Sequence, residues 1–275
     1  MDLVKTFLAL VLFAASPVWA NQIDVVLLGD DARMSVMEQC RSSCSAHGNV
    51  LGAPSRSSSA SDVASYAQHA KHAVIVIDAT QGPLPITREH IQIARQAGVP
   101  SLSMMFVNMR GLEGMRDAGE LVELVELEVR ELMNAYAMDG DSAMVFHDSR
   151  IRVIPSLHTN GVGLQQVLER VSATPPRRLF DVAYLTGTRL DSYVYVLTPE
   201  ESRLSRSLAN GSEVVLWVNG QVARGTVSAG ALTPGDNGEL VLQLTSAVKA
   251  TEGSRFLLER DGRVVGMGVV VRVRS

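Results

Sequence analysis

Cys40 and Cys44 have the widest chemical repertoire in this chain, and they lie four positions apart. On a regular helix that spacing holds the Cβ atoms farther apart than disulfide geometry prefers, so a bridge is expected only near a helix end. A redox-active pair usually has the spacing C-x-x-C, and two thiols alone rarely make a metal site. The sequence therefore leaves three alternatives for Cys40 and Cys44: a local structural disulfide, two unbridged thiols, or a redox role.

Histidines occur at two places where they could act chemically. His69 and His72 are spaced to share one face of a helix, but no cysteine or acidic side chain nearby completes a metal site, and we expect ordinary surface histidines. His147, Asp148 and Ser149 are the residue types of a hydrolase triad. A triad is defined by geometry in space and not by adjacency in the chain, so we predict no catalytic residue and no metal site.

Composition and the N-terminal residues limit the classes of function. A net charge of −4 does not give the basic surface that nucleic-acid binding usually needs. Lys5, the apolar run at 6–16 and Val18-Trp19-Ala20 together form a pattern typical of a secretory signal peptide at 1–20. A buried N-terminal strand or helix is the alternative. The apolar run is too short to span a bilayer, so we expect a periplasmic or secreted protein without a membrane span after cleavage.

Strand and helix patterns alternate from residue 21 to residue 172. Strands are expected at 23–29, 49–51, 73–78, 101–107 and 151–154, and helices at 34–45, 62–71, 87–97, 163–171 and in a segment that ends at Tyr136. For this last helix, Asp117 and Glu120 resemble a capping box, and Glu126 and Arg130 are spaced as an ion pair. Runs that are apolar on both faces suit a parallel sheet covered on both sides. The alternation predicts a doubly wound α/β domain.

A segment at 173–188 has the composition of a linker, and the pattern after it changes to short β-rich segments. Strands are expected at 193–197, 213–218, 225–228, 239–244, 255–259 and 264–273. Asn219-Gly220 and Asp261-Gly262 between them are turn signals. Residues 189–275 are therefore predicted to form an all-β barrel or sandwich.

Several stretches resemble bacterial elongation factor Tu, a translational GTPase. Residues 78–90, DATQGPLPITREH, and 121–132, LVELVELEVREL, are similar to its GTP-binding domain. Residues 233–237, TPGDN, and 253–270 resemble its third domain. The resemblance implies a GTPase-like parallel sheet followed by a C-terminal β-barrel. The family's middle barrel has no counterpart here beyond the short stretch 179–188.

The residues that handle nucleotide in that family are changed in this chain. A phosphate-binding loop needs the pattern G-x-x-x-x-G-K-[ST], and the corresponding stretch 29–36, GDDARMSV, lacks the second glycine, the lysine and the hydroxyl. Asp30 and Asp31 put negative charge where phosphate oxygens would lie. Two like charges ~4 Å apart repel by about 4 kcal/mol at an effective dielectric constant of ~20. Of the later motifs only Pro54 and Asn108 remain, and Gly111 replaces the acid that would bond guanine.

Gly29, Pro54 and Asn108 are therefore interpreted as vestigial nucleotide positions. We expect no cofactor and no catalysis, and a role in binding a protein partner, still to be identified, in the envelope or outside the cell. No nucleic acid is expected as a partner. The alternative is a divergent translation elongation factor that binds GTP in an altered way.

Overall fold

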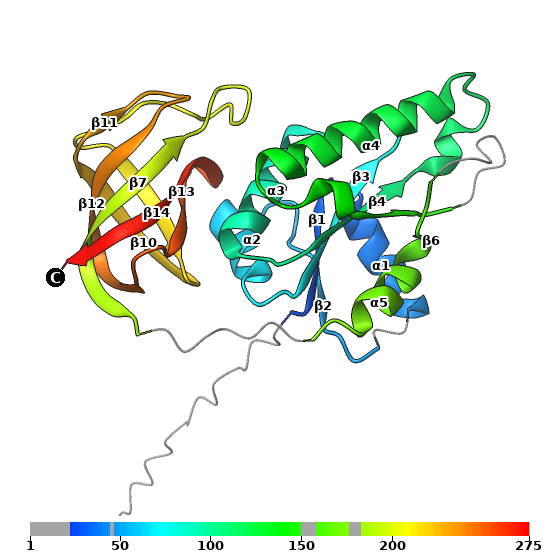
Figure 1. The fold of residues 1–275 in the computed structure, drawn as a ribbon, viewed down its shortest axis with the longest axis horizontal. Coiled ribbons are helices and arrows are strands. Elements are labelled where there is room, and N and C mark those ends of the chain that lie inside the picture. The colour runs from blue at the N-terminus through cyan, green and yellow to red at the C-terminus, as the bar shows by residue number, and fades with distance from the viewer. Residues whose placement is uncertain (1–22, 45–46, 150–157, 176–182, 275) are drawn as a thin grey trace, which may run out of the picture.

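The computed structural model describes residues 23–44, 47–149, 158–175 and 183–274, which form an α/β domain and a β-barrel (Figure 1). The expected signal peptide at 1–20, the strand expected at 151–154 and the middle of the expected linker lie outside the described residues. None of the helices in the described ranges contains an apolar stretch long enough to cross a membrane.

The α/β domain is built on a parallel six-stranded sheet with the order β2-β1-β3-β4-β5-β6. Its strands are β1 (Val25–Gly29), β2 (Leu51–Gly52), β3 (His72–Asp78), β4 (Leu102–Val107), β5 (Met144–His147) and β6 (Gly161–Val162). Every residue of β1, β3 and β4 is buried. The continuous apolar runs in the sequence reflect this position, because helices cover both faces of the sheet.

Within the described residues, five α-helices cover the sheet in two layers (Figure 1). They are α1 (Arg33–Ser43), α2 (Ala60–Ala67), α3 (Pro85–Ala97), α4 (Ala118–Ala135) and α5 (Gly163–Ser172). Helices α1 and α5 share one apolar cluster with Val25 and Leu27 of β1. Helices α2, α3 and α4 share the other with Val26 and Leu28. The alternation of side chains along the strand thus divides the core between the two layers.

Two of the local sequence signals for helices are confirmed by the structure, and one is wrong. Helix α3 begins with Pro85 and ends before Gly98, whose φ of 73° is left-handed, as the Gly signal predicts. The ion pair of Glu126 and Arg130 on α4 is confirmed at 2.8 Å. The capping box proposed at Asp117 is wrong, because its side chain makes no capping hydrogen bond. The described part of the domain also contains two short 3-10 helices, η1 (Met109–Leu112) and η2 (Gly140–Ser142).

Helix α2 is shorter than expected, and this corrects the interpretation of His72. The helix begins after Ser59, which forms a capping box with Asp62, and ends at Ala67. His72 then belongs to β3 and is only 2% exposed, so it is not a surface histidine. Its ring nitrogens lie 2.8 and 2.9 Å from the hydroxyls of Ser101 and Ser103 on the neighbouring segment. The spacing of His69 and His72 therefore does not put them on one helix face.

The second unit is a closed antiparallel barrel with the strand order β10-β12-β7-β14-β13-β9. Its strands are β7 (Leu185–Val196), β9 (Glu213–Val218), β10 (Gln221–Ala229), β12 (Asn237–Ala250), β13 (Arg255–Arg260) and β14 (Arg263–Arg274). A small two-stranded sheet, β8 (Leu208–Ala209) with β11 (Ala231–Leu232), lies beside it. The predicted fold class, a doubly wound parallel sheet followed by a β-barrel, is confirmed.

Two-residue hairpins connect the barrel strands where the turn signals are. Asn219 and Gly220 have φ values of 48° and 76°, and Asp261 and Gly262 have 49° and 78°, as tight turns between twisted strands require. Strand β7 begins at Leu185, so the last residues of the segment that looked like a linker already pair with β12.

The barrel packs directly against α2 and α3 (Figure 1). Trp217, Leu257, Val264 and Met267 of the barrel belong to the same buried apolar cluster as these helices. Polar contacts surround this shared core. On one side of it, the carboxylate of Glu89 on α3 accepts a hydrogen bond of 2.9 Å from the amide of Val264.

Candidate functional site

The candidate site lies at the carboxyl ends of β1, β3 and β4, which are neighbours in the sheet. In open parallel sheets this edge is the usual place for ligands. The strands end here in Gly29, Asp78 and Val107, and Asn108 follows directly. The turn between β1 and α1 is the element that would have to hold phosphate.

Four backbone amides in and next to this turn have acceptors within the protein. The amide of Gly29 donates to Nδ1 of His90 on α3 at 2.8 Å, and the amide of Asp30 donates to the carbonyl of Val76. The amides of Arg33 and Met34 donate to the carbonyls of Asp30 and Asp31. A phosphate cradle needs such N–H groups to point toward the ligand, and here these four are already hydrogen bonded.

The backbone conformation at position 29 and its close approach to β3 require a glycine there, whether or not a ligand binds. Its φ is 88°, and a Cβ atom at this position would lie 2.2 Å from the carbonyl oxygen of Val76. The backbone therefore crosses the end of β3 too closely for any side chain.

The carboxylate of Asp30 points into the protein and is 2% exposed. It accepts a hydrogen bond of 2.8 Å from the amide of Asp78 and one of 2.5 Å from the hydroxyl of Thr87. Burial raises the pKa of Asp30, and the hydrogen bond from Thr87 offsets part of this effect. Asp30 thus joins the ends of β1 and β3 to the start of α3.

Arg33 fills the space between the β1–α1 turn and the segment after β2. Its side chain is 2% exposed, and its guanidinium donates to the carbonyls of Gly29 at 3.0 Å, Pro54 at 3.1 Å and Ser55 at 3.1 Å. It also pairs with Asp31 at 3.1 Å. One internal cation therefore occupies three carbonyl acceptors of this corner.

Asn108 is exposed and is hydrogen bonded to the end of β3. It has a left-handed φ of 59°, and its Nδ2 donates to Asp78 at 2.6 Å. Asp78 also accepts two bonds from Thr80 and one from Gln81. Burial opposes the ionisation of Asp78, but these hydrogen bonds outweigh it and lower the pKa of the carboxyl.

Gly111, the position at which the sequence predicts that a base-binding acid is missing, is exposed. Gly111 lies in η1, where its amide donates to the carbonyl of Asn108 at 2.8 Å. A Cβ atom there would lie 3.0 Å from the methyl group of Thr80. The residue has no side chain that could accept hydrogen bonds from a guanine edge.

The structure therefore brings the three sequence-predicted positions into one network. Gly29 and Pro54 are connected through Arg33, and Asn108 is connected through Asp78 to Asp30. Sequence reasoning missed the buried acceptor role of His90 and the contact of Thr87. Both lie in the stretch at 78–90 that carried the resemblance, but no local pattern shows that they reach back to β1.

Cys40 and Cys44 form a disulfide, with Cα atoms 4.7 Å apart. Helix α1 ends at Ser43, and Cys44 has extended dihedral angles of −97° and 142°. Because Cys44 lies just outside the helix, the bridge avoids the spacing that a regular helix would impose.

No group of three or more possible metal ligands occurs within the described residues. His147 ends β5 and is buried, while Ser149 donates to Asp148 rather than to a histidine. The three neighbours do not form the hydrogen-bond chain of a triad.

Residues 45–177 match the family model described as the elongation factor Tu GTP binding domain. The match begins after the β1–α1 turn and ends before the barrel, so it covers the part of the α/β domain that runs from the end of α1 to the end of α5. It supports a relationship between this segment and the GTP-binding domains of translational GTPases.

Proposed function

We propose that this chain is an exported GTPase-like protein that has lost nucleotide hydrolysis and tight nucleotide binding and acts by binding another protein. The observation that carries the proposal is the closure of the β1–α1 turn by Arg33 and Asp30. Both side chains are buried and bonded to the protein itself.

Phosphate binding at this turn would require several unfavourable changes at once. The amides of Gly29 and Asp30 would have to leave their present acceptors. The carboxylate of Asp30 would remain beside the phosphate with no lysine to offset the repulsion. The buried Arg33 would have to leave three carbonyl acceptors without donors, and each buried unsatisfied group costs about 1–3 kcal/mol.

Export is supported by the N-terminal pattern at 1–20 and agrees with the disulfide. Disulfides persist in oxidising compartments and are rare in the bacterial cytosol. GTP and ribosomes are absent from such compartments, so a protein working there would have no use for the ancestral chemistry.

The test is a calorimetric titration of the purified chain with GTP and GDP, with and without Mg²⁺, and with ATP as the control nucleotide. We expect no saturable heat with any of the three. Circular dichroism on the same sample shows that the protein is folded. Mg²⁺-dependent binding of GTP in the micromolar range, without binding of ATP, would overturn the proposal.

A second candidate is a divergent translation factor that still binds GTP. It is favoured by the match over residues 45–177 and by the retention of Asn108. The two candidates differ in location. N-terminal sequencing of the protein isolated from cells distinguishes them, because export predicts a chain that begins at Asn21. An intact Met1 and sedimentation with ribosomes would favour the second candidate.

A further inference from the structure

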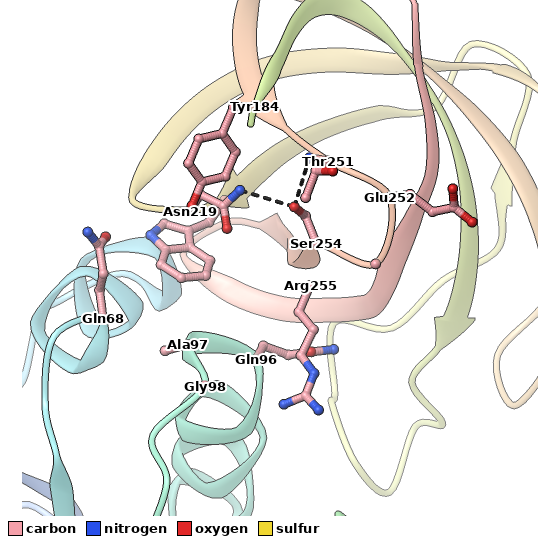
Figure 2. Close-up of a pocket in the computed structure, with 12 residues that line it drawn as sticks. Gln68, Gln96, Ala97, Gly98, Tyr184, Asn219, Thr251, Glu252, Ser254 and Arg255 are labelled. Atoms are coloured by element: carbon pink, nitrogen blue, oxygen red, sulfur yellow. Dashed lines mark hydrogen bonds between the residues drawn. The ribbon is translucent and has the colours of Figure 1, made fainter. Parts of the chain in front are cut away.

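A cleft of about 520 Å³ lies where the ends of α2 and α3 meet the barrel (Figure 2). Its lining includes Gln68, Gln96, Tyr184, Trp217, Asn219 and Arg255. The volume is within the roughly 300–1,000 Å³ that is usual for ligand sites. The cleft shares no residue with the β1–α1 turn.

The cleft is bordered by a cation without an acidic partner. The guanidinium of Arg255 donates to the carbonyl of Arg95 at the end of α3 at 3.0 Å, and no carboxylate within the described residues forms an ion pair with it. Arg95 is close by, and its pKa is lowered by burial and by the charge of Arg255. The cleft lining itself carries one cation, Arg255, and one carboxylate, Glu252. Because these two do not form an ion pair, Arg255 can still pair with an anionic group of a ligand.

A buried amide lies beside this cation. Gln96 is 4% exposed, and its Oε1 has no hydrogen-bond partner among the described residues. Figure 2 shows Gln96, at the end of α3, and Arg255 among the residues that line the cleft. A buried carbonyl oxygen without a donor costs free energy. Gln96 lines the cleft, so a ligand N–H group bound there can satisfy this oxygen.

An aromatic surface forms the barrel side of the cleft. Trp217 is 2% exposed and donates through Nε1 to the hydroxyl of Ser65 at 3.2 Å. Tyr184 is 45% exposed at the mouth. The exposed ring can cover an apolar side chain of a ligand whose charged end lies at Arg255.

We propose that this cleft binds the C-terminal end of a peptide, with the terminal carboxylate at Arg255, the last amide N–H at Gln96 Oε1 and the last side chain against Tyr184. The C-terminal end of a peptide has a carboxylate next to an amide N–H, so it can pair with Arg255 and with Gln96 Oε1 at the same time. The proposal names a partner class for the protein-binding role above and rests on that role. The nucleotide titration tests a different site, so either experiment can fail without the other.

The experiment uses the chain without the proposed signal peptide, residues 21–275, in which Trp217 is the single tryptophan. Its fluorescence is recorded during titration with acetyl-Ala-Phe, with the same dipeptide as a C-terminal amide, and with inorganic phosphate. We expect a saturable change with the free acid and at least about tenfold weaker binding of the amide, because a charge-assisted hydrogen bond is lost.

Arg255→Gln keeps an N–H donor for the Arg95 carbonyl and removes the charge, and it should weaken binding of the free acid about tenfold. Gln96→Leu should weaken the free acid and the amide alike. Arg272→Gln, at an exposed position of β14 outside the cleft, is the matched control and should leave affinity unchanged.

Three results would overturn the proposal: no saturable response to the free acid, equal binding of acid and amide, or phosphate binding as tight as that of the dipeptide. The last would make the cleft a general anion site. Equal loss of affinity in Arg255→Gln and Arg272→Gln would also exclude the assigned contact.

Discussion

The carboxylate of Glu259 in the barrel accepts two hydrogen bonds from Ser61 at the start of α2, one from its amide at 2.7 Å and one from its hydroxyl at 2.6 Å. These residues are 198 positions apart, and Glu259 is 8% exposed. The helix N-terminus, which carries partial positive charge, is thus satisfied by a side chain of the other unit. The two units are joined by specific polar contacts as well as by apolar packing.

Replacing Glu259 by alanine should therefore lower the free energy of unfolding by about 2 kcal/mol, because the buried Ser61 loses a charged acceptor. Urea unfolding followed by circular dichroism measures the change. Glu239→Ala, at an exposed position of β12, is the control and should have little effect. If both variants unfold at the same urea concentration, the Ser61 contact does not stabilise the protein.

Replacing Arg33 by alanine should destabilise the α/β domain by about 3 kcal/mol, since it empties a buried volume and leaves three carbonyl oxygens without donors. Arg41→Ala is the matched change on an exposed arginine of the same helix. Denaturant midpoints of the two variants give the comparison. A loss for Arg33→Ala no greater than that for Arg41→Ala would contradict the closure of the β1–α1 turn described above.

Stability should fall as the pH is lowered from 7 to 5, because burial holds the pKa of His90 at about 3 and that of His72 at about 4. In the unfolded chain a histidine titrates near 6.5, so below that pH the unfolded state binds more protons and is favoured. Each histidine contributes about 1.4 kcal/mol per pH unit below 6.5 and above its folded pKa.

His90→Asn separates this effect from other titrations, since the amide oxygen can still accept the Gly29 hydrogen bond but cannot titrate. The variant should lose less stability between pH 7 and pH 5 than the unaltered chain, by about 2 kcal/mol. Burial raises the pKa values of Asp30 and Glu89, which act in the opposite direction, and the comparison removes their contribution because both proteins contain them. Identical pH profiles would show that His90 is not buried in its neutral form.

Reduction of the Cys40–Cys44 disulfide should cost about 2 kcal/mol, because the bridge closes a very short loop and so removes little entropy from the unfolded chain. Thermal unfolding with and without dithiothreitol measures this cost. The double variant Cys40→Ser, Cys44→Ser should not respond to the reductant. A complete loss of folding on reduction would show that the bridge does more than fix the end of α1.

The sequence was sufficient where the structure depends on local chemistry. The strand at 213–218 was predicted with its observed ends, because the Asn219-Gly220 turn follows it directly. Helix α3 has a proline at its start and a glycine after its end, and its expected bounds differ from the observed ones by two residues at the start. Strand β5 was missed, since its residues 144–147 are too few to show a period.

For the candidate site, the sequence predicts only that the phosphate-binding motif is changed, and it does not predict the contacts that the changed residues make. The missing lysine and hydroxyl are visible in the residues at 29–36. That Arg33 turns inward to Pro54, and that Thr87 and His90 meet the end of β1, depends on contacts 21 to 61 positions apart. No local pattern encodes such contacts, because they arise only when the sheet and α3 have assembled.

The apolar cluster shared by α2, α3 and the barrel has a practical consequence. Trp217, Leu257 and Val264 are at most 2% exposed, and they would be left bare on a barrel produced by itself. Such a fragment would aggregate through this exposed apolar surface. Anyone wishing to divide this chain for crystallisation or labelling should keep residues 23–274 in one piece.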